Sequence, residues 1–299
     1  MPAVPAPRVC FVSCARWPEV SASDAVVQQA LEARGAVVAV RPWNGEGARF
    51  DGFDVVVFRS CWDYHHAPDA YLAWLARWEA AGVRFWNPPD LVRWNLSKRY
   101  LHALAAAGVP VVPTVTLETG QEARLPAVLA ERGWAAAVVK PLVSASGHDT
   151  TLVDAGEAPA LARAIAEGRL RRPVMVQPFV PEIRTAGEWS LVFIDGAFTH
   201  AVLKHPADGD FRVQPSFGGR SAATTPDATT LAAGRATLAA LPTPPLYARV
   251  DGVATGTGFV VMEVELHEPG LFFTHAPRAG EVFAEAILRR VRASDGPRS

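Results

Sequence analysis

Two apolar, β-branched segments late in the chain constrain its fold more than any other feature. They cover residues 248–251 and 261–265, and a stretch rich in glycine and threonine, residues 254–258, separates them. Apolar runs joined by turn-forming residues are typical of a β-hairpin. We therefore expect two paired strands with Ala254–Gly258 at the tip of the turn.

This hairpin carries three carboxylates that its geometry would bring together. Side chains alternate along a strand, so Glu263 and Glu265 point to one face, and Asp251 joins them if the partner strand is in register. Three adjacent carboxylates repel one another unless a cation lies among them, and an all-oxygen set suits Mg²⁺ or Mn²⁺. The same pattern is also typical of the solvent-exposed face of an antiparallel strand, so the hairpin alone does not decide between them. The opposite face is expected to meet a core through Val260, Met262 and Val264.

Charge and hydrophobicity limit the classes of protein to which this chain can belong. With 299 residues, 49% of them hydrophobic, it can form two or three compact lobes. The net charge of −1 predicts no nucleic-acid or membrane-surface partner, and no apolar run is long enough to span a bilayer. The proline-rich start, Met1–Arg8, does not have the pattern of a signal peptide. A sparse, odd set of cysteines (Cys10, Cys14 and Cys61) fits reduced thiols and predicts a cytoplasmic protein.

The first part of the chain alternates between strand and helix patterns. Short apolar runs predict strands at residues 9–12, 37–40, 54–58 and 83–86. One helix would begin at a serine cap, Ser21 or Ser23, and end at Arg34, and a second would cover residues 70–81. This alternation predicts a small open α/β sheet with mostly parallel strands, and no G-x-G-x-x-G dinucleotide motif is present. Asn87–Pro89 marks the end of this domain, which we assign to residues 1–89.

Two further domains are expected after this boundary, at residues 90–176 and 177–299. The first should begin with one helix over residues 90–107. Strand and helix patterns follow at residues 111–115, 123–132, 135–139, 150–153, 158–167 and 174–177. In the second, Asp195-Gly196 between two apolar runs predicts a hairpin with a type I′ turn. A helix at residues 227–240, the carboxylate hairpin and a helix at residues 281–292 complete the chain.

Two lysines are candidates for binding anions. Lys140 ends an apolar strand pattern, where a buried ammonium needs a nearby anion, although a structural ion pair would serve equally well. The small residues 143–147 that follow it would let backbone N–H groups approach phosphates closely. Lys98 lies on the predicted helix 90–107, where an ordinary solvated helix face is the simpler interpretation.

The order of these motifs resembles that of the ATP-grasp superfamily of ligases. Lys140-Pro141 with its small-residue loop, the segment Gln177–Val180, the strand start Gly187–Ser190 and the carboxylate hairpin with Arg249 occur in that order. The resemblance covers about residues 90–292. It implies an α/β (α+β) ATP-grasp fold preceded by a Rossmann-like pre-ATP-grasp domain, with ATP and Mg²⁺ or Mn²⁺ as cofactors. It also implies that a substrate carboxylate becomes an acyl phosphate, which a nitrogen then attacks.

The resemblance assigns roles to individual residues. The expected contacts to the ATP phosphates are Lys98, Lys140, Ser144, Ser146 and Gly147. The expected contacts to adenine and ribose are Gln177, Phe179, Val180 and Glu188, with Glu182 as an alternative to Glu188. The expected metal ligands are Asp251, Glu263 and Glu265. Arg249 would stabilise the negative charge of the tetrahedral intermediate.

Residues suited to a small, amino-acid-like zwitterion occur in the first domain and before the hairpin. The segment Arg59–Tyr64 follows a buried strand pattern, and open α/β sheets bind ligands at the carboxyl ends of their strands. A surface loop with one packed tryptophan would explain the same segment. The resemblance adds Lys204 and Arg212 as catalytic anion contacts. The expected substrate contacts are Ser13, Arg59, Asp63, Tyr64, Gly218 and Gly219.

Within the superfamily, the chain resembles the O-ureidoserine cyclo-ligases in its length, its segment 59–64 and its run from Gln177 to Ser190. This resemblance implies that ATP activates the carboxylate of O-ureido-D-serine and that a nitrogen of the same molecule closes the ring of D-cycloserine. One alternative is an intermolecular amide ligase that joins an amino acid or peptide carboxylate to a separate amine. A non-catalytic nucleotide-binding protein is a second alternative, but a degenerate copy should have lost metal ligands that are present here. A homodimer is the expected oligomeric state.

Overall fold

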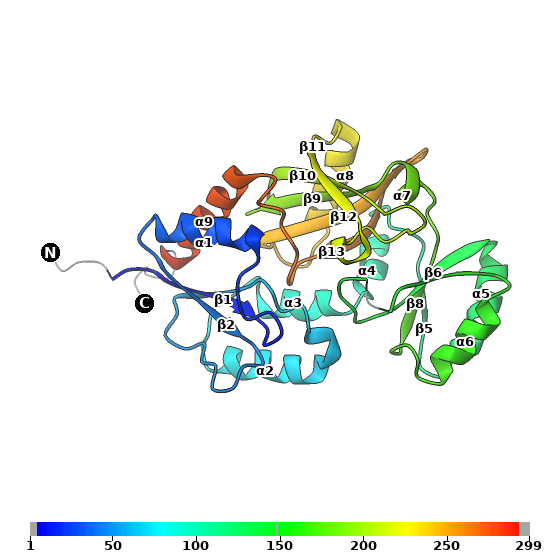
Figure 1. Ribbon diagram of the computed structural model, residues 1–299, viewed down its shortest axis with the longest axis horizontal. Coiled ribbons are helices and arrows are strands. Elements are labelled where there is room, and N and C mark those ends of the chain that lie inside the picture. The colour runs from blue at the N-terminus through cyan, green and yellow to red at the C-terminus, as the bar shows by residue number, and fades with distance from the viewer. Residues whose placement is uncertain (1–4, 148, 293–299) are drawn as a thin grey trace.

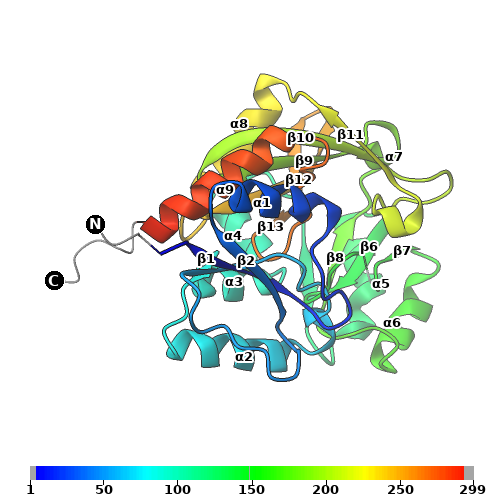
Figure 2. The same cartoon turned by 60° about the vertical axis from the view of Figure 1, so that its left-hand side comes forward.

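The computed structural model describes residues 5–147 and 149–292, which form three β-sheets with surrounding helices (Figure 1). Turning the molecule by 60° shows the same three lobes around a common centre (Figure 2). Residues 1–4 of the proline-rich start, His148 of the small-residue loop and residues 293–299 lie outside the described residues. The sequence analysis expected that Met1–Arg8 is not part of a signal peptide, and part of that segment therefore lies outside the described residues.

The first lobe is the parallel α/β sheet that the sequence predicts. Its strand order is β2-β1-β3-β4, and every pairing between these strands is parallel. The strands are β1 (Arg8–Ser13), β2 (Val37–Pro42), β3 (Val55–Phe58) and β4 (Phe85–Trp86). The helices between them are α1 (Ala22–Glu32) and α2 (Pro68–Ala80), with a 3₁₀ turn at Tyr64–His66. Ser21 is the cap of α1, because its side chain accepts a hydrogen bond from the backbone N–H of Asp24.

The last helix, α9 (Pro277–Arg292), packs beside α1 in both views and completes the core of the first lobe (Figures 1 and 2). Phe283 and Ile287 of α9 are fully buried in one cluster with Val27 of α1 and Val57 of β3. Residues from opposite ends of the chain therefore share a core. The proposed division at residue 89 does not separate independent cores.

The expected single helix over residues 90–107 is wrong. The structure has two helices, α3 (Pro89–Leu96) and α4 (Tyr100–Ala106), because Ser97 adopts an extended conformation with φ −102° and ψ 127°. The backbone N–H of Lys98 donates to the Leu142 carbonyl at 2.9 Å, outside any helix. The break takes Lys98 off a helix face and ties it to the loop after Lys140.

The second lobe is a small antiparallel sheet with the order β5-β8-β6-β7. Its strands are β5 (Val115–Leu117), β6 (Ala136–Pro141), β7 (Thr151–Asp154) and β8 (Val174–Pro178). Helices α5 (Leu125–Arg132) and α6 (Ala158–Ala166), with a 3₁₀ turn at Glu122–Arg124, cover its outer face (Figure 1). The strand expected at residues 111–115 is misplaced, because β5 begins at Val115 and Val111 only bridges to Val261. The proposed domain boundary after residue 176 falls within β8.

The third lobe is a five-stranded antiparallel sheet with the order β11-β10-β9-β12-β13. Its strands are β9 (Glu188–Ile194), β10 (Ala197–His205), β11 (Arg220–Thr224), β12 (Tyr247–Thr255) and β13 (Gly258–Glu265). Helix α8 (Ala228–Ala239) packs on the sheet, and short helical segments occur at α7 (Glu182–Thr185) and Pro215–Phe217. Asp195 and Gly196 have φ values of 52° and 79°, which confirms the predicted type I′ turn.

The carboxylate hairpin forms as predicted, except that the side chains around residue 262 do not point to the expected faces of the strand. Asp251 pairs with Glu263 and Arg249 with Glu265, so these side chains share one face. The turn is shorter than expected, because β12 continues to Thr255 and β13 begins at Gly258. A β-bulge between Asp251 and Gly252 leaves Met262 as the extra residue of β13. The expected alternation therefore fails there: Met262 lines a cavity and Val261, not Val260, is buried.

Side-chain amides connect the edge of this hairpin to the first lobe. Asn87, fully buried, donates to the carbonyls of Tyr247 (2.8 Å) and Leu266 (2.6 Å) and accepts from the N–H of Leu246 (2.6 Å). Asn95 of α3 pairs in the same manner with the backbone of Val264 and Leu266. These amides satisfy buried backbone groups that a sheet edge would leave unpaired.

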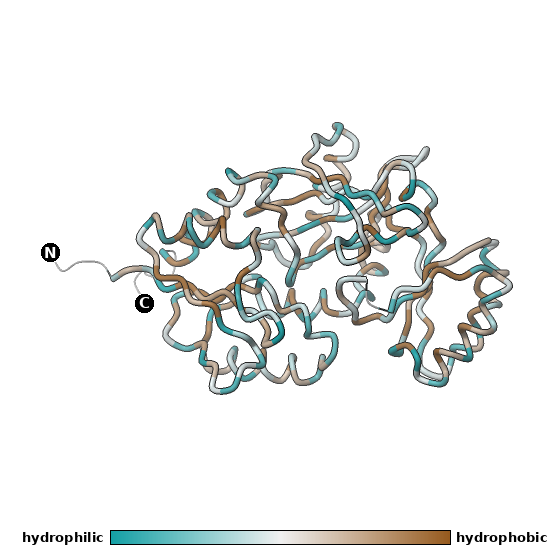
Figure 3. The backbone as a smooth tube through the Cα atoms, in the orientation of Figure 1, coloured by the Kyte–Doolittle hydropathy of each residue, from teal (hydrophilic) through white to brown (hydrophobic). Residues whose placement is uncertain are grey.

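Hydrophobic stretches follow the strands inside each lobe, and hydrophilic residues gather at the turns (Figure 3). The three cysteines are free and buried in the first lobe. Among the described helices, none has the length and apolar character needed to cross a membrane.

Candidate active site

A cavity of about 470 Å³ lies where the three lobes meet. Trp62 and Tyr64 of the first lobe, Lys140 of the small sheet and Arg249 of the five-stranded sheet all line it. The same face of the five-stranded sheet is apolar at its other end, where Val192 and Tyr247 belong to the core shared with α1 and α9. One end of this face thus anchors the first lobe, and the other end forms the cavity wall.

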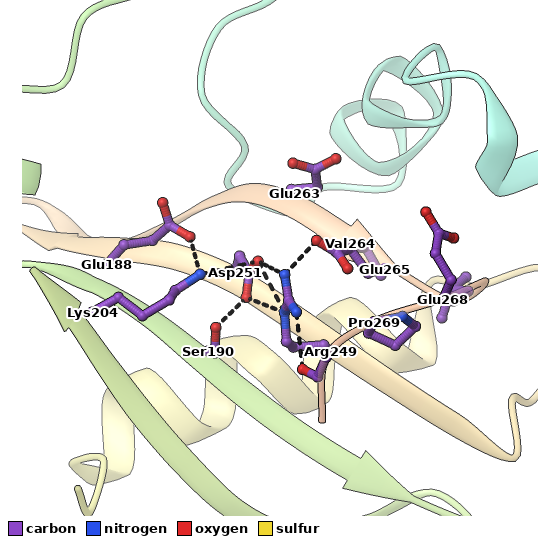
Figure 4. A network of polar contacts seen from close by, with 12 residues as sticks. Glu188, Ser190, Lys204, Arg249, Asp251, Glu263, Val264, Glu265, Glu268 and Pro269 are labelled. Carbon is purple, nitrogen blue, oxygen red and sulfur yellow. Dashed lines mark hydrogen bonds and ion pairs between the residues drawn. The ribbon is translucent and has the colours of Figure 1, made fainter. Parts of the chain in front are cut away.

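Arg249 is the centre of the polar network on this wall (Figure 4). Its guanidinium donates to both carboxylate oxygens of Asp251 at 2.8–3.1 Å, to the Gly270 carbonyl at 2.9 Å and to Glu265. Although burial favours a neutral acid, Arg249 and Lys204 lower the pKa of Asp251 to about 2. Burial has the opposite result at Glu265, whose pKa rises to about 8 despite Arg249.

Lys204 and Glu188 form a second buried group beside Asp251. The Lys204 ammonium donates to Glu188 and lies 3.4 Å from Asp251, to which Ser190 also donates at 2.6 Å. Although burial favours the neutral amine, Asp251 and Glu188 raise the pKa of Lys204. Lys204 and Glu188, expected to contact substrate and ribose, thus bind each other at the cavity wall.

The two candidate phosphate lysines have different partners. Lys98 Nζ lies 2.7 Å from Glu263 and donates to the Ser144 carbonyl at 2.9 Å. The ammonium of Lys140 forms neither an ion pair nor a hydrogen bond with any residue that the structure describes, and burial lowers its pKa. The backbone turn at Ser146 and Gly147 has positive φ values of 54° and 69°, and both residues line the cavity with Ser144. Lys140 therefore offers a half-buried cation with no direct ion pair among the described residues, although the carboxylate of Glu263 acts on it electrostatically.

The expected metal ligands have suitable chemistry but are engaged by cations. Glu263 and Glu265 each expose 28% of their side chains, whereas Asp251 exposes 4% and is bound by Arg249, Ser190 and Lys204. Over residues 5–147 and 149–292, no three His, Cys, Asp or Glu side chains are arranged to hold a metal ion. A hard cation fits this set of oxygen ligands if it replaces Lys98 as the partner of Glu263 and Arg249 as the partner of Glu265.

The segment expected to bracket adenine lines the cavity at Gln177, Phe179 and Val180. The Gln177 amide donates to the Thr114 hydroxyl at 2.9 Å, which fixes its orientation. Phe179 packs edge-on against Phe211, with ring centroids 6.1 Å apart. The cavity wall includes Glu188 but not its alternative Glu182.

Only some of the expected substrate contacts reach the cavity. Tyr64 and Gly219 line it, as does Arg212, which binds Asp210 at 2.8 Å and stacks over Phe217 at 3.6 Å. The remaining four expected contacts lie outside the cavity wall: Ser13, Arg59, Asp63 and Gly218.

The first-domain candidates among these four have structural partners instead. Arg59 is buried, with Nε 2.8 Å from Asp24, and it donates to the Pro269 carbonyl at 2.8 Å. Asp63 accepts hydrogen bonds from Trp43 (2.6 Å) and Asn44 (2.9 Å). Arg59 thus joins the first lobe to the segment after β13 without reaching the cavity.

Several cavity residues did not emerge from the sequence patterns. Asn95 and Tyr100 line the wall from α3 and α4, and Glu268 lines it after the end of β13. Glu268 extends the acidic series of Glu263 and Glu265 just before Pro269-Gly270, which is the one signal that could have indicated it.

Comparisons with known proteins match most of the chain. The N-terminal domain of D-cycloserine synthetase DcsG matches residues 9–87, and the ATP-grasp domain of prokaryotic glutathione synthetase matches residues 102–242. Cycloserine biosynthesis protein DcsG of Streptomyces lavendulae is 35% identical over 285 residues, covering 88% of this chain and 92% of the relative. Glutathione synthetase of Parasynechococcus marenigrum (strain WH8102) is 34% identical over 196 residues, covering 61% and 59%.

Solved structures agree with these matches. The crystal structure of D-cycloserine synthetase DcsG superposes with a TM-score of 0.86 at 31% identity, covering 95% of this chain and 99% of that one. D-alanine–D-alanine ligase of Bacillus anthracis complexed with ATP has a TM-score of 0.70 at 17% identity, covering 98% and 100%, which is a likeness of fold. The predicted ATP-grasp fold is confirmed. The chain therefore belongs to the DcsG family of ATP-grasp proteins and is an ATP-dependent carbon–nitrogen ligase.

Proposed function

We propose that this enzyme is a cyclo-ligase that converts O-ureido-D-serine to D-cycloserine with ATP. The observation that carries the proposal is the similarity to DcsG at 35% identity over 92% of that protein. The match of residues 9–87 to the DcsG N-terminal domain also supports it, because this lobe supplies Trp62 and Tyr64 to the cavity.

The phosphates of ATP bind at the lysine end of the cavity. Lys140 forms no direct ion pair among the described residues, so its half-buried ammonium is available to bind a phosphate. Lys98 reaches the same phosphates from the helix break, and the turn at Ser144–Gly147 covers them. A bound Mg²⁺ or Mn²⁺ would be held by Glu263 and Glu265, with Asp251 as a third ligand, and would neutralise phosphoryl charge.

Arg249 and Lys204 act at the carbonyl carbon. The substrate carboxylate attacks the γ-phosphorus, ADP leaves, and the acyl phosphate forms. The oxyamine nitrogen then attacks the acyl carbon and loses its proton, and phosphate leaves as the five-membered ring closes. Arg249 faces the cavity with a fixed guanidinium and stabilises the oxyanion of the tetrahedral intermediate. Water then removes the carbamoyl group as carbon dioxide and ammonia.

Ring closure requires a held substrate geometry and exclusion of competing water rather than a second amine site. The walls contributed by Trp62, Tyr64 and Phe272 fit that requirement, because they line the cavity with aromatic surface. An intermolecular ligase would need room for a second substrate in the same 470 Å³ beside ATP.

The test is ADP release with Mg²⁺ and O-ureido-D-serine as the only organic substrate, with the product identified by mass spectrometry. ADP release with formation of D-cycloserine and no added amine supports the proposal. ADP release only when an amino acid and a separate amine are both present would replace it by the intermolecular amide ligase. The predicted homodimer is checked on the same preparation by light scattering.

A further inference from the structure

One carboxylate in the cavity wall differs from the others in its partner. Five acidic side chains line the cavity: Glu188, Asp251, Glu263, Glu265 and Glu268. Four of them are ion-paired to a lysine or arginine. Among the described residues, Glu268 is instead paired with an imidazole, that of His267.

The position of Glu268 is fixed by its own backbone. Trp62 of the first lobe donates its indole N–H to the Glu268 carbonyl at 3.0 Å. The following residue, Pro269, is held by Arg59 through its carbonyl at 2.8 Å. In Figure 4 the Glu268 side chain stands apart from the Arg249 network, with no dashed line to another drawn residue.

A buried imidazole and phenol support this carboxylate. His267 is 2% exposed, and its Nδ1 lies 2.6 Å from Glu268 Oε2. Its Nε2 lies 2.5 Å from the hydroxyl of Tyr71, which is fully buried. The Nδ1 of His267 has no hydrogen-bond partner, so its contact with Glu268 is a close approach of the two side chains. Among the described residues, no lysine or arginine side chain pairs with the Glu268 carboxylate.

We propose that Glu268 binds the protonated amino group of an amino-acid-like substrate, with His267 and Tyr71 as residues that position it. An ammonium supplies the missing positive charge, and the aromatic side chains of Trp62 and Tyr64 line the cavity with it. This subsite takes the role that Asp63 was expected to play. It deepens the proposed function, because it selects substrates that carry an amine beside the reacting carboxylate.

The experiment compares each amino substrate with its counterpart that lacks the amine, in the wild type and in Glu268→Gln. One pair is O-ureido-D-serine and 3-(ureidooxy)propanoate, and the other is D-alanine and propanoate, each with ATP, Mg²⁺ and hydroxylamine as an external nucleophile. Because glutamine keeps the size but not the charge, the amine preference in kcat/KM should fall by about 10- to 100-fold in the variant. The KM for ATP should stay within about twofold of the wild type, because the phosphate lysines are unchanged.

Control variants separate this role from a structural one. Glu268→Asp keeps the charge and should retain part of the preference, and Glu131→Gln, on the exposed side of α5, should retain all of it. Tyr71→Phe should weaken the preference for the amine more than it lowers turnover of the substrate without an amine. Thermal melting of each variant reports whether it is folded.

The two proposals fail in different ways. A wild type that turns over D-alanine but not O-ureido-D-serine overturns the cyclo-ligase function while the amine preference is still measured. If Glu268→Gln keeps the full amine preference, or the wild type has none on any substrate, the ammonium subsite is refuted.

Discussion

Replacing Lys140 by methionine should remove activity and raise stability at the same time. Methionine has nearly the length of lysine but no charge, so it fills the same space in β6. The ammonium that it removes is half-buried and forms no direct ion pair with any described residue, and burial outweighs the attraction of Glu263 in setting its pKa. Relieving that desolvation should stabilise the free enzyme by about 1–2 kcal/mol at pH 7. For a chain of this size the melting temperature should rise by about 2–4 °C.

The sign of this change follows from the pKa of Lys140, which burial lowers below its ordinary value of 10.5. Between the lowered and the ordinary pKa, the unfolded chain binds more protons than the folded chain, so wild-type stability rises with pH in that window. The charge penalty is therefore complete below the lowered pKa. The stability gain of the variant should be largest near neutral pH and shrink toward pH 10.5.

Lys98→Met is the matched control, because it removes the same group from a paired site. Lys98 binds Glu263 at 2.7 Å and the Ser144 carbonyl, so its loss leaves a carboxylate without its cation. Since the Glu263 side chain is 28% exposed, the loss of stability should be modest, about 1 kcal/mol. Both variants should lower kcat/KM for ATP by about 10²–10³-fold, because each removes a charge that faces the phosphates.

Calorimetry and ADP release measured on the same preparations decide the outcome. A Lys140→Met enzyme that melts below the wild type would show that the ammonium has a stabilising partner in the free protein. A variant with unchanged kcat/KM for ATP would show that Lys140 does not contact the phosphates.

Three further predictions follow from other parts of the structure. Asn87→Ala should lower the free energy of unfolding by about 3 kcal/mol or more, measured by urea denaturation, because four backbone groups lose a hydrogen bond to its side chain. Gln29→Ala, on the exposed side of α1, should change the free energy of unfolding by less than about 0.5 kcal/mol. Burial raises the pKa of the Cys10 thiol from 9.0 to about 12. The contribution of this thiol to the free energy of unfolding is therefore complete below pH 9 and is lost as pH rises toward 12, with a slope near 1.4 kcal/mol per pH unit. Cys10→Ala should remove this pH dependence from the free energy of unfolding. Arg249→Lys should lower kcat by about 10²–10³-fold with little change in the KM for ATP, because an ammonium cannot span Asp251 and Glu265 together; an unchanged kcat would contradict the oxyanion role.

Local patterns predicted most of the strands and the carboxylate hairpin, because alternation and turn residues act within a few positions of each other. They misplaced the strand expected at residues 111–115 and gave no sign of β11. The pairing of Asp251 with Glu263 needed only the strand period and a register. The bulge at Met262 was not predictable in this way, since one extra residue in a strand leaves no mark on an apolar run. The break at Ser97 was not predictable from local patterns either, because the sequence around it has a continuous helical pattern. Its extended backbone accompanies a hydrogen bond from the Lys98 N–H to the carbonyl of Leu142, which is distant in the sequence.

The substrate side was harder to predict for a different reason. Arg59 and Asp63 carry the opposite charges that a site for a zwitterion needs, and they follow a strand, where open α/β sheets bind ligands. Their partners, Asp24 and Trp43, are set by tertiary contacts that composition does not reveal. Glu268 was overlooked because its position in the cavity wall, without a lysine or arginine partner among the described residues, is set by tertiary contacts.

Charge pairing inside the cavity leaves two groups of opposite charge without an ion-pair partner of lysine, arginine or acidic type. Across the described part of the chain, the basic residues of the wall are each paired with an acid, except Lys140. The acids are each paired with a lysine or arginine, except Glu268. The free enzyme thus keeps its catalytic charges neutralised by one another and leaves one cation and one anion without such a partner. In the proposals made above, a phosphate would satisfy the first and an ammonium would satisfy the second. A substrate with an amine near its carboxylate would then be held at Glu268 by its amine while its carboxylate reacts with ATP bound at Lys140.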